Sequence, residues 1–366
     1  MQRAVDRQGL AKRARITDVA RAAGVSKTTV SFAFNSPERL SSETADRILA
    51  IARDLGYRPD PVARMLTVQR TSTLGILTPQ SLSQIFANPF FPLFAEGVGA
   101  VGEERGYGLL VISPLHGSLA GALARATVDG VVALGLEETH PDVEWVRQAG
   151  IPLVLVDAVA WPEHGAVEID DEGGARAAAD HVAALGHRDV LLICIEPQSP
   201  AARAADVESI MNRRLRGWRA GLEAAGVPAD DAHVLAGPAT FEGGETAMLR
   251  AWEDGLRPSA VLAMSDAMAI GVLQAARHLR LRVPGDLSAA GFDDLPISRF
   301  TDPPLTTVHQ PVREKGEAAA RLLLAMIGEP GRSPEHLRFE TRLVVRQSTA
   351  PLSQGDTGPG EVGRHD

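Results

Sequence analysis

The sequence contains few cysteine and aromatic residues. Its 366 residues include one cysteine, Cys194, and 4% aromatic residues. A single cysteine excludes an internal disulfide bond, and its place in the apolar run LLICIE predicts a buried, unreactive thiol. Alanine, glycine, valine and leucine must supply most of the core. With 45% hydrophobic residues, the chain is long enough for two or three domains that each bury a core.

Long apolar segments are also missing. No stretch approaches the 18 or so uncharged apolar residues that a membrane-spanning helix needs. The first residues, MQRAVDRQGLAKRAR, lack the apolar centre of a secretory signal. We therefore expect a cytoplasmic protein with no membrane partner.

Motifs for catalysis or cofactor binding are absent as well. The sequence has no phosphate-binding G-x-x-x-x-G-K-[ST], no H-E-x-x-H and no paired C-x-x-C, and its ten histidines are scattered. GVGAVG at 97–102 matches G-x-G-x-x-G, but the helical segment FFPLFAE precedes it instead of a strand. A helix face of small residues is the better interpretation. We expect that the protein is not an enzyme and that it binds neither a cofactor nor a metal ion.

Charge is distributed unevenly along the chain. Residues 1–71 contain 13 Lys and Arg against 7 Asp and Glu, whereas the remainder contains 24 against 39. A basic head is attracted to phosphate, and an acidic body opposes non-specific coating of DNA. A chance excess of arginine at one end is the alternative interpretation.

Three short helical patterns follow one another between residues 16 and 57. The first, ITDVARAAG, ends at Gly24, and the second begins after Ser26, a favourable N-cap for the backbone N–H of Thr29. The third, SSETADRILAIARDLGY, begins after Ser41 and ends at Gly56, with apolar residues at helical spacing. These patterns predict a small three-helix domain.

A short, isolated helical pattern follows in RPDPVARMLTVQRTS. Asp60 can cap it and Pro61 suits the first helical position, but the pattern ends near Val68. About two turns of helix are not stable alone in water. The segment is either a linker or a helix that forms only with a partner.

Strand and helix patterns alternate from Thr73 onward. Near-continuous apolar runs such as VDGVVAL, IPLVLVD and RDVLLICI are separated by segments such as GARAAADHVAALG and AMAIGVLQAARHLR. This alternation is typical of parallel sheets covered on both faces. The number of units predicts two α/β subdomains with a ligand cleft at the carboxyl ends of their strands.

Together these motifs resemble the LacI/GalR family of bacterial transcription regulators. The resemblance runs from about Arg15 to Thr349, and its most specific parts are ITDVARAAGVSKTTVSFAFN, ETADRILAIARDLGYRPDPVARML, AMSDAMAIGVLQAARHLRLRVPGDLS and GFDD with PPLTTVHQP. The fold it implies has a helix-turn-helix head of three helices, a hinge helix and two doubly wound α/β subdomains like those of periplasmic sugar-binding proteins. It also implies a homodimer on a near-palindromic double-stranded operator.

The resemblance implies specific DNA contacts. Lys27, Thr28 and Phe32 match base-reading positions of the family, and Phe32 departs from the polar or basic residue that many members carry. Phe32 either packs on thymine methyl groups or belongs to the small core. Arg15 replaces a capping threonine common in relatives. The remaining residues expected at the DNA are Thr17, Ser26, Thr29 and Ser31, with Ala63 and Leu66 on the hinge helix in the minor groove.

The resemblance also implies a small-molecule effector, with a carbohydrate as the leading candidate. The residues that match effector-binding positions are Phe90, Phe91, Asp170, Arg214, Phe241, Asp266 and Asp293. Structural roles are the alternative: the phenylalanines in the core, Asp293 in a turn and Arg214 in an ion pair. Ser265 stands where relatives often have asparagine. Glu208 and Ile210 stand where relatives often have polar residues that contact ligand, which indicates a reshaped pocket.

The expected function is repression of transcription under control of this effector. The resemblance leaves open whether the ligand releases or strengthens operator binding, and activation at some promoters is the less favoured outcome. A transport-type sugar receptor without a DNA role is the alternative, but it requires an export signal and no DNA-binding head.

The expected domains follow in order along the chain. They are a disordered basic arm (1–14), the helix-turn-helix domain (15–58), the hinge helix and linker (59–71), the effector-binding and dimerisation domain (72–350) and a disordered tail (351–366). In the fourth of these, subdomain one is expected at about 72–168 and 303–332, and subdomain two at about 169–300 and 335–350. The chain would cross between them near Ile169–Asp171, Phe300–Pro303 and Arg332–His336.

Overall fold

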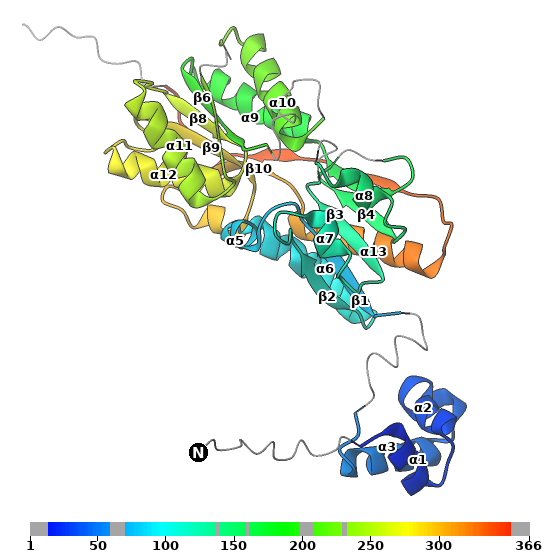
Figure 1. Cartoon of the computed structure of the whole chain (residues 1–366). Helices are drawn as coiled ribbons and strands as arrows, with labels where there is room; N and C mark the ends of the chain where they lie inside the picture. Colours follow the sequence, from blue (N-terminus) through cyan, green and yellow to red (C-terminus); the bar gives the residue numbers. More distant parts are fainter. Residues whose placement is uncertain are drawn as a thin grey trace, which may run out of the picture. The chain divides into compact units, whose positions relative to one another are not determined.

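The structure is a computed structural model of the whole chain, and it divides into two compact units, Met1–Thr71 and Ser72–Asp366 (Figure 1). The residues that it describes are 14–58, 70–136, 140–158, 161–197, 208–228 and 233–352. The predicted arm and tail lie almost wholly outside these ranges. The same holds for the hinge helix, including Ala63 and Leu66.

The first unit is the predicted three-helix domain. Its elements are α1 (Ile16–Ala23), α2 (Lys27–Asn35), the 3-10 turn η1 (Pro37–Arg39) and α3 (Ser42–Asp54). Ser26 and Ser41 cap α2 and α3, because their hydroxyls accept the backbone N–H groups of Thr29 and Thr44. At the start of α1 the carboxylate of Asp18 accepts the backbone N–H of Arg15 at 2.9 Å, so this helix start does not need a capping threonine.

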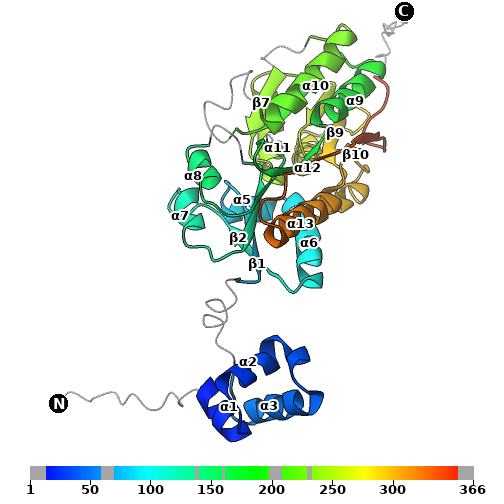
Figure 2. The ribbon, with the colours of Figure 1, turned by 90° about the vertical axis from the view of Figure 1, so that its right-hand side faces the viewer.

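The second unit contains two six-stranded sheets (Figures 1 and 2). The first has the order β11-β5-β4-β3-β1-β2, and all its neighbouring strands are parallel. Its strands are β1 (Thr73–Leu77), β2 (Gly108–Ile112), β3 (Gly130–Leu134), β4 (Leu153–Val156), β5 (Gly165–Ile169) and β11 (His336–Phe339). The helices of this half are α5 (Leu82–Ala87), α6 (Phe90–Glu104), α7 (Leu119–Leu123), α8 (Val143–Arg147) and α13 (Val312–Gly328).

The second sheet has the order β12-β10-β9-β8-β6-β7, and β12 alone is antiparallel to its neighbour. Its strands are β6 (Val190–Ile195), β7 (Val234–Gly237), β8 (Ala260–Ala263), β9 (Ser288–Asp293), β10 (Thr306–His309) and β12 (Arg342–Val344). The helices of this half are α9 (Asp171–Ala184), α10 (Ile210–Ala224), α11 (Phe241–Glu253), α12 (Asp266–His278) and the 3-10 turn η4 (Pro296–Arg299).

The inner strands of both sheets are buried on both faces, as the continuous apolar runs predict, whereas edge strands such as β2 and β11 are largely exposed. In β6, Leu192 and Cys194 pack in the cluster that includes α9 and α10, while Leu191 and Ile193 pack with α11 and α12. Alternate residues of a strand point to opposite faces, so each face needs its own apolar set. Cys194 is buried, as predicted, and burial raises the pKa of its thiol to about 12, which disfavours the reactive thiolate.

The chain crosses three times between the two halves, and two of the predicted crossing points are wrong. β10 pairs with β9, so the chain crosses after His309 and not near Phe300–Pro303. β11 pairs with β5, so the last crossing follows Phe339 and not Arg332–His336. The prolines at 303 and 304 look like a boundary in sequence, but the strand that follows them still belongs to the second sheet.

The segment GVGAVG forms part of α6, which confirms the helix-face interpretation. A Cβ atom added at Gly97 would lie 2.0 Å from the backbone oxygen of Arg313 in α13, whereas nothing lies within 4 Å of one added at Gly99. Gly97 therefore permits the close approach of α6 and α13, and the motif has a packing role.

Candidate functional site

The amino-terminal turn of α2 presents polar side chains at the surface. Lys27 and Thr28 are exposed. Thr29 is half-buried, and its hydroxyl lies 2.8 Å from the hydroxyl of Ser26, the capping residue. The hydroxyl of Ser31, also half-buried, accepts a hydrogen bond from the side-chain amide of Asn35 at 3.2 Å. The turn thus exposes the ammonium group of Lys27 and the hydroxyl of Thr28, neither of which takes part in capping the helix.

Phe32 lies outside the core of this unit. The buried cluster contains Val30 and Ala33, and Phe34 packs against it edge-to-face with Tyr57 at 5.7 Å between ring centroids. Phe32 is half-buried and is neither a member of this cluster nor one of the partly buried residues packed against it. The core alternative for Phe32 is therefore not supported. Of the other expected DNA-contacting residues, Thr17 is half-buried near the start of α1.

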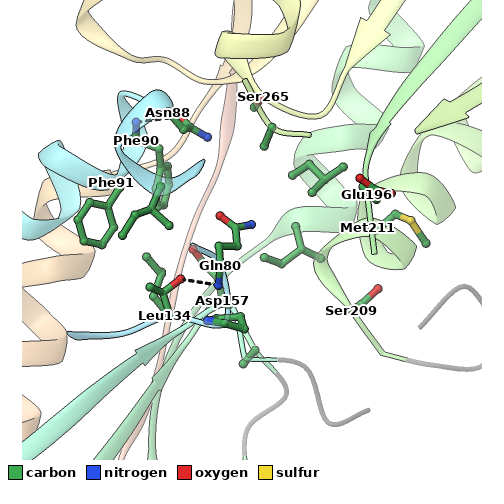
Figure 3. Close-up of a pocket in the computed structure, with 18 of the residues that line it drawn as sticks. Gln80, Asn88, Phe90, Phe91, Leu134, Asp157, Glu196, Ser209, Met211 and Ser265 are labelled. Atoms are coloured by element: carbon green, nitrogen blue, oxygen red, sulfur yellow. Dashed lines mark hydrogen bonds between the residues drawn. The ribbon is translucent and has the colours of Figure 1, made fainter. Parts of the chain in front are cut away.

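A pocket lies between the two sheets of the second unit (Figure 3). Strand ends build it: Thr78 follows β1, Leu134 ends β3, Ile195 ends β6 and Asp293 ends β9. These are carboxyl ends, where parallel sheets bind ligands. The pocket is lined by Thr78, Pro79, Gln80, Ile85, Asn88, Phe90, Phe91, Leu134, Gly135, Asp157, Ala158, Ile195, Glu196, Pro197, Glu208, Ser209, Ile210, Met211, Arg214, Ala239, Ser265 and Asp293.

The two phenylalanines contribute to the pocket in different ways. Phe91 is almost fully buried and also belongs to the core of the first half, where its ring meets that of Phe86 edge-to-face. Phe90 is half-buried and stacks against Phe94 at 6.3 Å. Figure 3 shows Asn88, Phe90 and Phe91 on one side of the pocket, opposite Glu196 and Met211. The rings give the pocket an apolar wall.

Arg214 is a buried cation in the opposite wall, on α10. Its Nε donates to Asp171 at 2.8 Å, its Nη1 donates to the carbonyl of Met264, and its guanidinium lies 3.6 Å above the centroid of the Phe292 ring. Burial alone would raise the pKa of Asp171, but Arg214 and Arg213 hold it below its ordinary value. Among the described residues Nη2 of Arg214 has no hydrogen-bond partner. The guanidinium is thus fixed in place with one nitrogen available to a ligand.

Asp293 is the buried acid of the same wall. Its Oδ1 accepts a hydrogen bond from Gln310 at 2.6 Å and lies 3.9 Å from Nη1 of Arg214. Burial raises the pKa of Asp293 to about 6, although Arg214 and Gln310 act to lower it. Gln310 stands where the chain crosses from β10 to α13, and its Oε1 is buried with no hydrogen-bond partner in the described structure. Asp293 therefore connects the pocket to a crossing segment.

A buried ion pair also lies at the pocket wall that the half with the first sheet forms. Nζ of Lys315 donates to both oxygens of Asp157, at 2.7 and 2.6 Å, and lies 5.1 Å from the centroid of the Phe90 ring. Lys315 has no exposed side-chain surface, and Asp157 lines the pocket. The sequence prediction contained neither residue. A lysine inside the amphipathic pattern REKGEAAARLLL gives no local sign that it is buried.

Three of the predicted effector residues lie off the pocket. Asp266 is fully buried and holds η4 and β10, because it accepts the backbone N–H of Leu295 and the hydroxyls of Ser298 and Thr307. Burial and the charge of Asp293 raise the pKa of Asp266 to about 8, although the three hydrogen-bond donors act to lower it.

The other two residues have positions at helix ends. Asp170 caps α9 through the backbone N–H of Gly173 and pairs with Arg338 at 2.6 Å. Phe241 is the half-buried first residue of α11, and the pocket reaches its neighbour Ala239 but not its ring. The structure thus brings Phe90, Phe91, Arg214 and Asp293 of the predicted set to the pocket. It adds Asp157 and Ser265 to the lining, with Lys315 paired to Asp157 behind it.

Family models describe both units of the chain. Residues 15–60 match the model for bacterial regulatory proteins of the lacI family, and residues 179–349 match a periplasmic binding protein-like domain. The regulator CelR of Thermobifida fusca is 34% identical over 337 residues, which cover 90% of this chain and 96% of CelR. The chain belongs to the LacI family of bacterial regulatory proteins. This LacI-family chain is a DNA-binding transcriptional regulator, and α1 to α3 form its helix-turn-helix domain.

Solved structures of the family have the same fold. A CelR–cellobiose complex is 31% identical with a TM-score of 0.67, and the match covers 92% of this chain and all of that one. A lac repressor dimer bound to operator and an anti-inducer is 25% identical with a TM-score of 0.76, over 93% of this chain and all of that one. Within the described part of the chain no helix could span a membrane, and no group of three or more potential ligand residues is arranged for a metal ion.

Proposed function

We propose that this LacI-family regulator is a homodimeric repressor whose affinity for a near-palindromic operator changes when a carbohydrate occupies the pocket between its two sheets. One observation carries this proposal: a polar helix turn exposed on one unit accompanies a pocket with fixed polar groups on the other. A sugar receptor for transport would use the pocket but would have no task for the helix-turn-helix domain.

The DNA-binding half of the proposal rests on α2. Lys27 can donate to guanine acceptors or phosphate, and Thr28 can hydrogen-bond or contact a thymine methyl group. A two-fold symmetric dimer places two such helices in successive major grooves. The operator should therefore be a near-palindrome with half-sites about one helical turn, or a multiple of it, apart.

The ligand half of the proposal rests on the polar atoms in the pocket. Nη2 of Arg214 can donate to a sugar hydroxyl, and the carboxylate of Asp293 can accept from one. Phe90 offers an aromatic surface to the apolar C–H face of a sugar ring. The relative CelR is known in a cellobiose complex, so cellobiose is the first ligand to test.

Regulation requires the ligand to favour one arrangement of the two halves. The pocket has Phe90 on one half and Arg214 on the other, so a ligand that contacts both walls stabilises the closed arrangement. Asp293 adds a direct link, because Gln310 in a crossing segment is hydrogen-bonded to the carboxylate that a ligand would engage. Operator affinity then changes by the ratio of ligand affinities in the two arrangements.

Two measurements test the proposal. Selection from random DNA duplexes with the full chain should enrich one near-palindromic motif. If no motif is enriched, either without ligand or with a panel of neutral mono- and disaccharides, sequence-specific operator binding is excluded. Thermal unfolding across the same panel, beginning with cellobiose, should show a rise in melting temperature for at least one sugar. A rise that persists in Arg214→Met would place that sugar outside the pocket. Arg250→Met, which changes an exposed pair with Asp254 away from the pocket, is the control.

A further inference from the structure

The carboxyl end of α2 carries a contact between an aromatic ring and a cation. The guanidinium carbon of Arg39, in η1, lies 5.2 Å from the centroid of the Phe32 ring. This distance is within the range of a cation–π interaction. Arg39 is exposed, and in the described part of the head its side chain makes no hydrogen bond and no ion pair. The ring of Phe32 is therefore what orients this guanidinium.

Phe32 lies on the same side of α2 as the polar turn. It follows Thr28 by four residues and Thr29 by three, the spacings at which side chains are neighbours on a helix. Phe32 itself cannot donate a hydrogen bond to a base. The attraction of a guanidinium to an aromatic ring uses its positive charge and leaves its N–H groups able to donate to another acceptor. The pair thus adds a guanidinium with five N–H donors beside Phe32, on the side of α2 that also carries Thr28.

We propose that Arg39, held against Phe32, is a specificity-determining residue that reads a guanine in the operator. The inference rests on the proposed function of α2 as the reading helix. A guanidinium matches the O6 and N7 acceptors of guanine in the major groove, which is the contact that phenylalanine cannot make. In this proposal Phe32 on α2 positions the side chain of Arg39 in η1, and Arg39 donates the hydrogen bonds to the base.

The test compares operator motifs selected by the full-length chain and its variants. Random duplexes are selected with wild type, Arg39→Ala, Phe32→Leu and Arg53→Ala. Arg53 is an exposed arginine on α3, so its variant removes the same charge from the same domain. We expect Arg39→Ala to lose the preference for guanine at one position of each half-site. We expect Phe32→Leu to weaken that preference and Arg53→Ala to keep it.

Affinity for the wild-type motif provides the quantitative readout. Arg39→Ala should bind this motif about 5- to 100-fold more weakly than Arg53→Ala does, because a bidentate guanine contact contributes roughly that discrimination. Substitution of the one base pair should abolish the difference between the two variants. Circular dichroism should show unchanged helix content in both, since both side chains are exposed.

Three results would overturn the inference. If Arg39→Ala selects the wild-type motif and loses affinity equally for every sequence, Arg39 contacts phosphate instead of a base. If Arg39→Ala changes nothing, the guanidinium does not touch DNA. If Phe32→Leu keeps full guanine preference, the ring does not position it. Failure of wild type to select any motif would instead contradict the proposed function, and so the two failures are distinguishable.

Discussion

Replacement of Lys315 by methionine should destabilise the second unit more than most single substitutions would. The side chain has no exposed surface, and its Nζ donates to both oxygens of Asp157, which is itself 6% exposed. These are the hydrogen bonds that the Asp157 carboxylate makes in the described structure. Methionine fills a similar volume, so the main effect is a buried carboxylate without its cation.

The expected loss follows from this geometry. Removal of one partner from a buried ion pair costs about 3–5 kcal/mol, because the remaining charge stays desolvated. Two charge-assisted hydrogen bonds at roughly 1.5–3 kcal/mol each give a similar range. Replacement of both partners, in Lys315→Met with Asp157→Asn, leaves no unpaired charge and should recover most of the loss, and asparagine tolerates the positive φ of 53° at position 157.

Denaturant unfolding followed by tryptophan fluorescence measures this effect. All four tryptophans lie between residues 145 and 252, so the signal reports the second unit and not the head. Lys315→Met should lower the transition midpoint strongly, the double variant should return close to wild type, and Arg321→Met, on the exposed side of α13, should change little. A loss below about 1 kcal/mol for Lys315→Met would refute the buried-pair reasoning.

Four further predictions concern other parts of the chain. Asp293→Ala should remove the response of operator binding to the effective sugar while the chain stays folded, and an undiminished response would exclude Asp293 from the site. Because the pKa of Asp266 is raised to about 8, the unfolded chain ionises this carboxyl from about pH 4 while the folded chain keeps it protonated, so the unfolding free energy falls as pH rises from about 4 to 8; Asp266→Asn should flatten this loss in unfolding free energy measured against pH. Gly97→Ala should cost about 1–3 kcal/mol by separating α6 from α13, while Gly99→Ala should be neutral or stabilising by up to about 1 kcal/mol; equal melting temperatures would contradict the packing role. Leu66→Ala, at the proposed hinge position, should weaken binding to the selected motif while sparing random DNA, and an equal loss on both would contradict that assignment.

The helices of the head were predictable because their signals are local. Ser26 and Ser41 stand one residue before the helices that they cap, and Gly24 ends α1 with a positive φ of 66°. Each signal concerns residues within a few positions of one another. The order of strands and helices in the second unit was predictable for the same reason, since apolar runs and helical periodicity are read over short windows.

The crossings were missed because strand pairing is a long-range property. β11 consists of HLRF, is mostly exposed, and gives no apolar run, yet it pairs with β5, whose residues lie about 170 positions earlier. β10 follows two prolines that suggest a domain boundary. Neither strand's partner can be inferred from its own residues.

The site was predicted in part for a related reason. The resemblance located Arg214 and Asp293 because they stand in recognisable motifs. It also included Asp266, whose burial depends on Ser298 and Thr307, more than thirty residues away in sequence. Lys315 was missed because its partner Asp157 is 158 positions away. The charged groups of a pocket are paired with residues far away in sequence, and a sequence motif contains only one residue of each pair.

The most direct test of the account is the dissociation constant of the selected operator, measured with and without a sugar that raises the melting temperature of the chain. Occupancy of the pocket should change that constant at least about 5-fold, in either direction, and the operator should change the affinity for the sugar by the same factor. An operator affinity that stays constant while the sugar saturates the pocket would contradict ligand control of DNA binding.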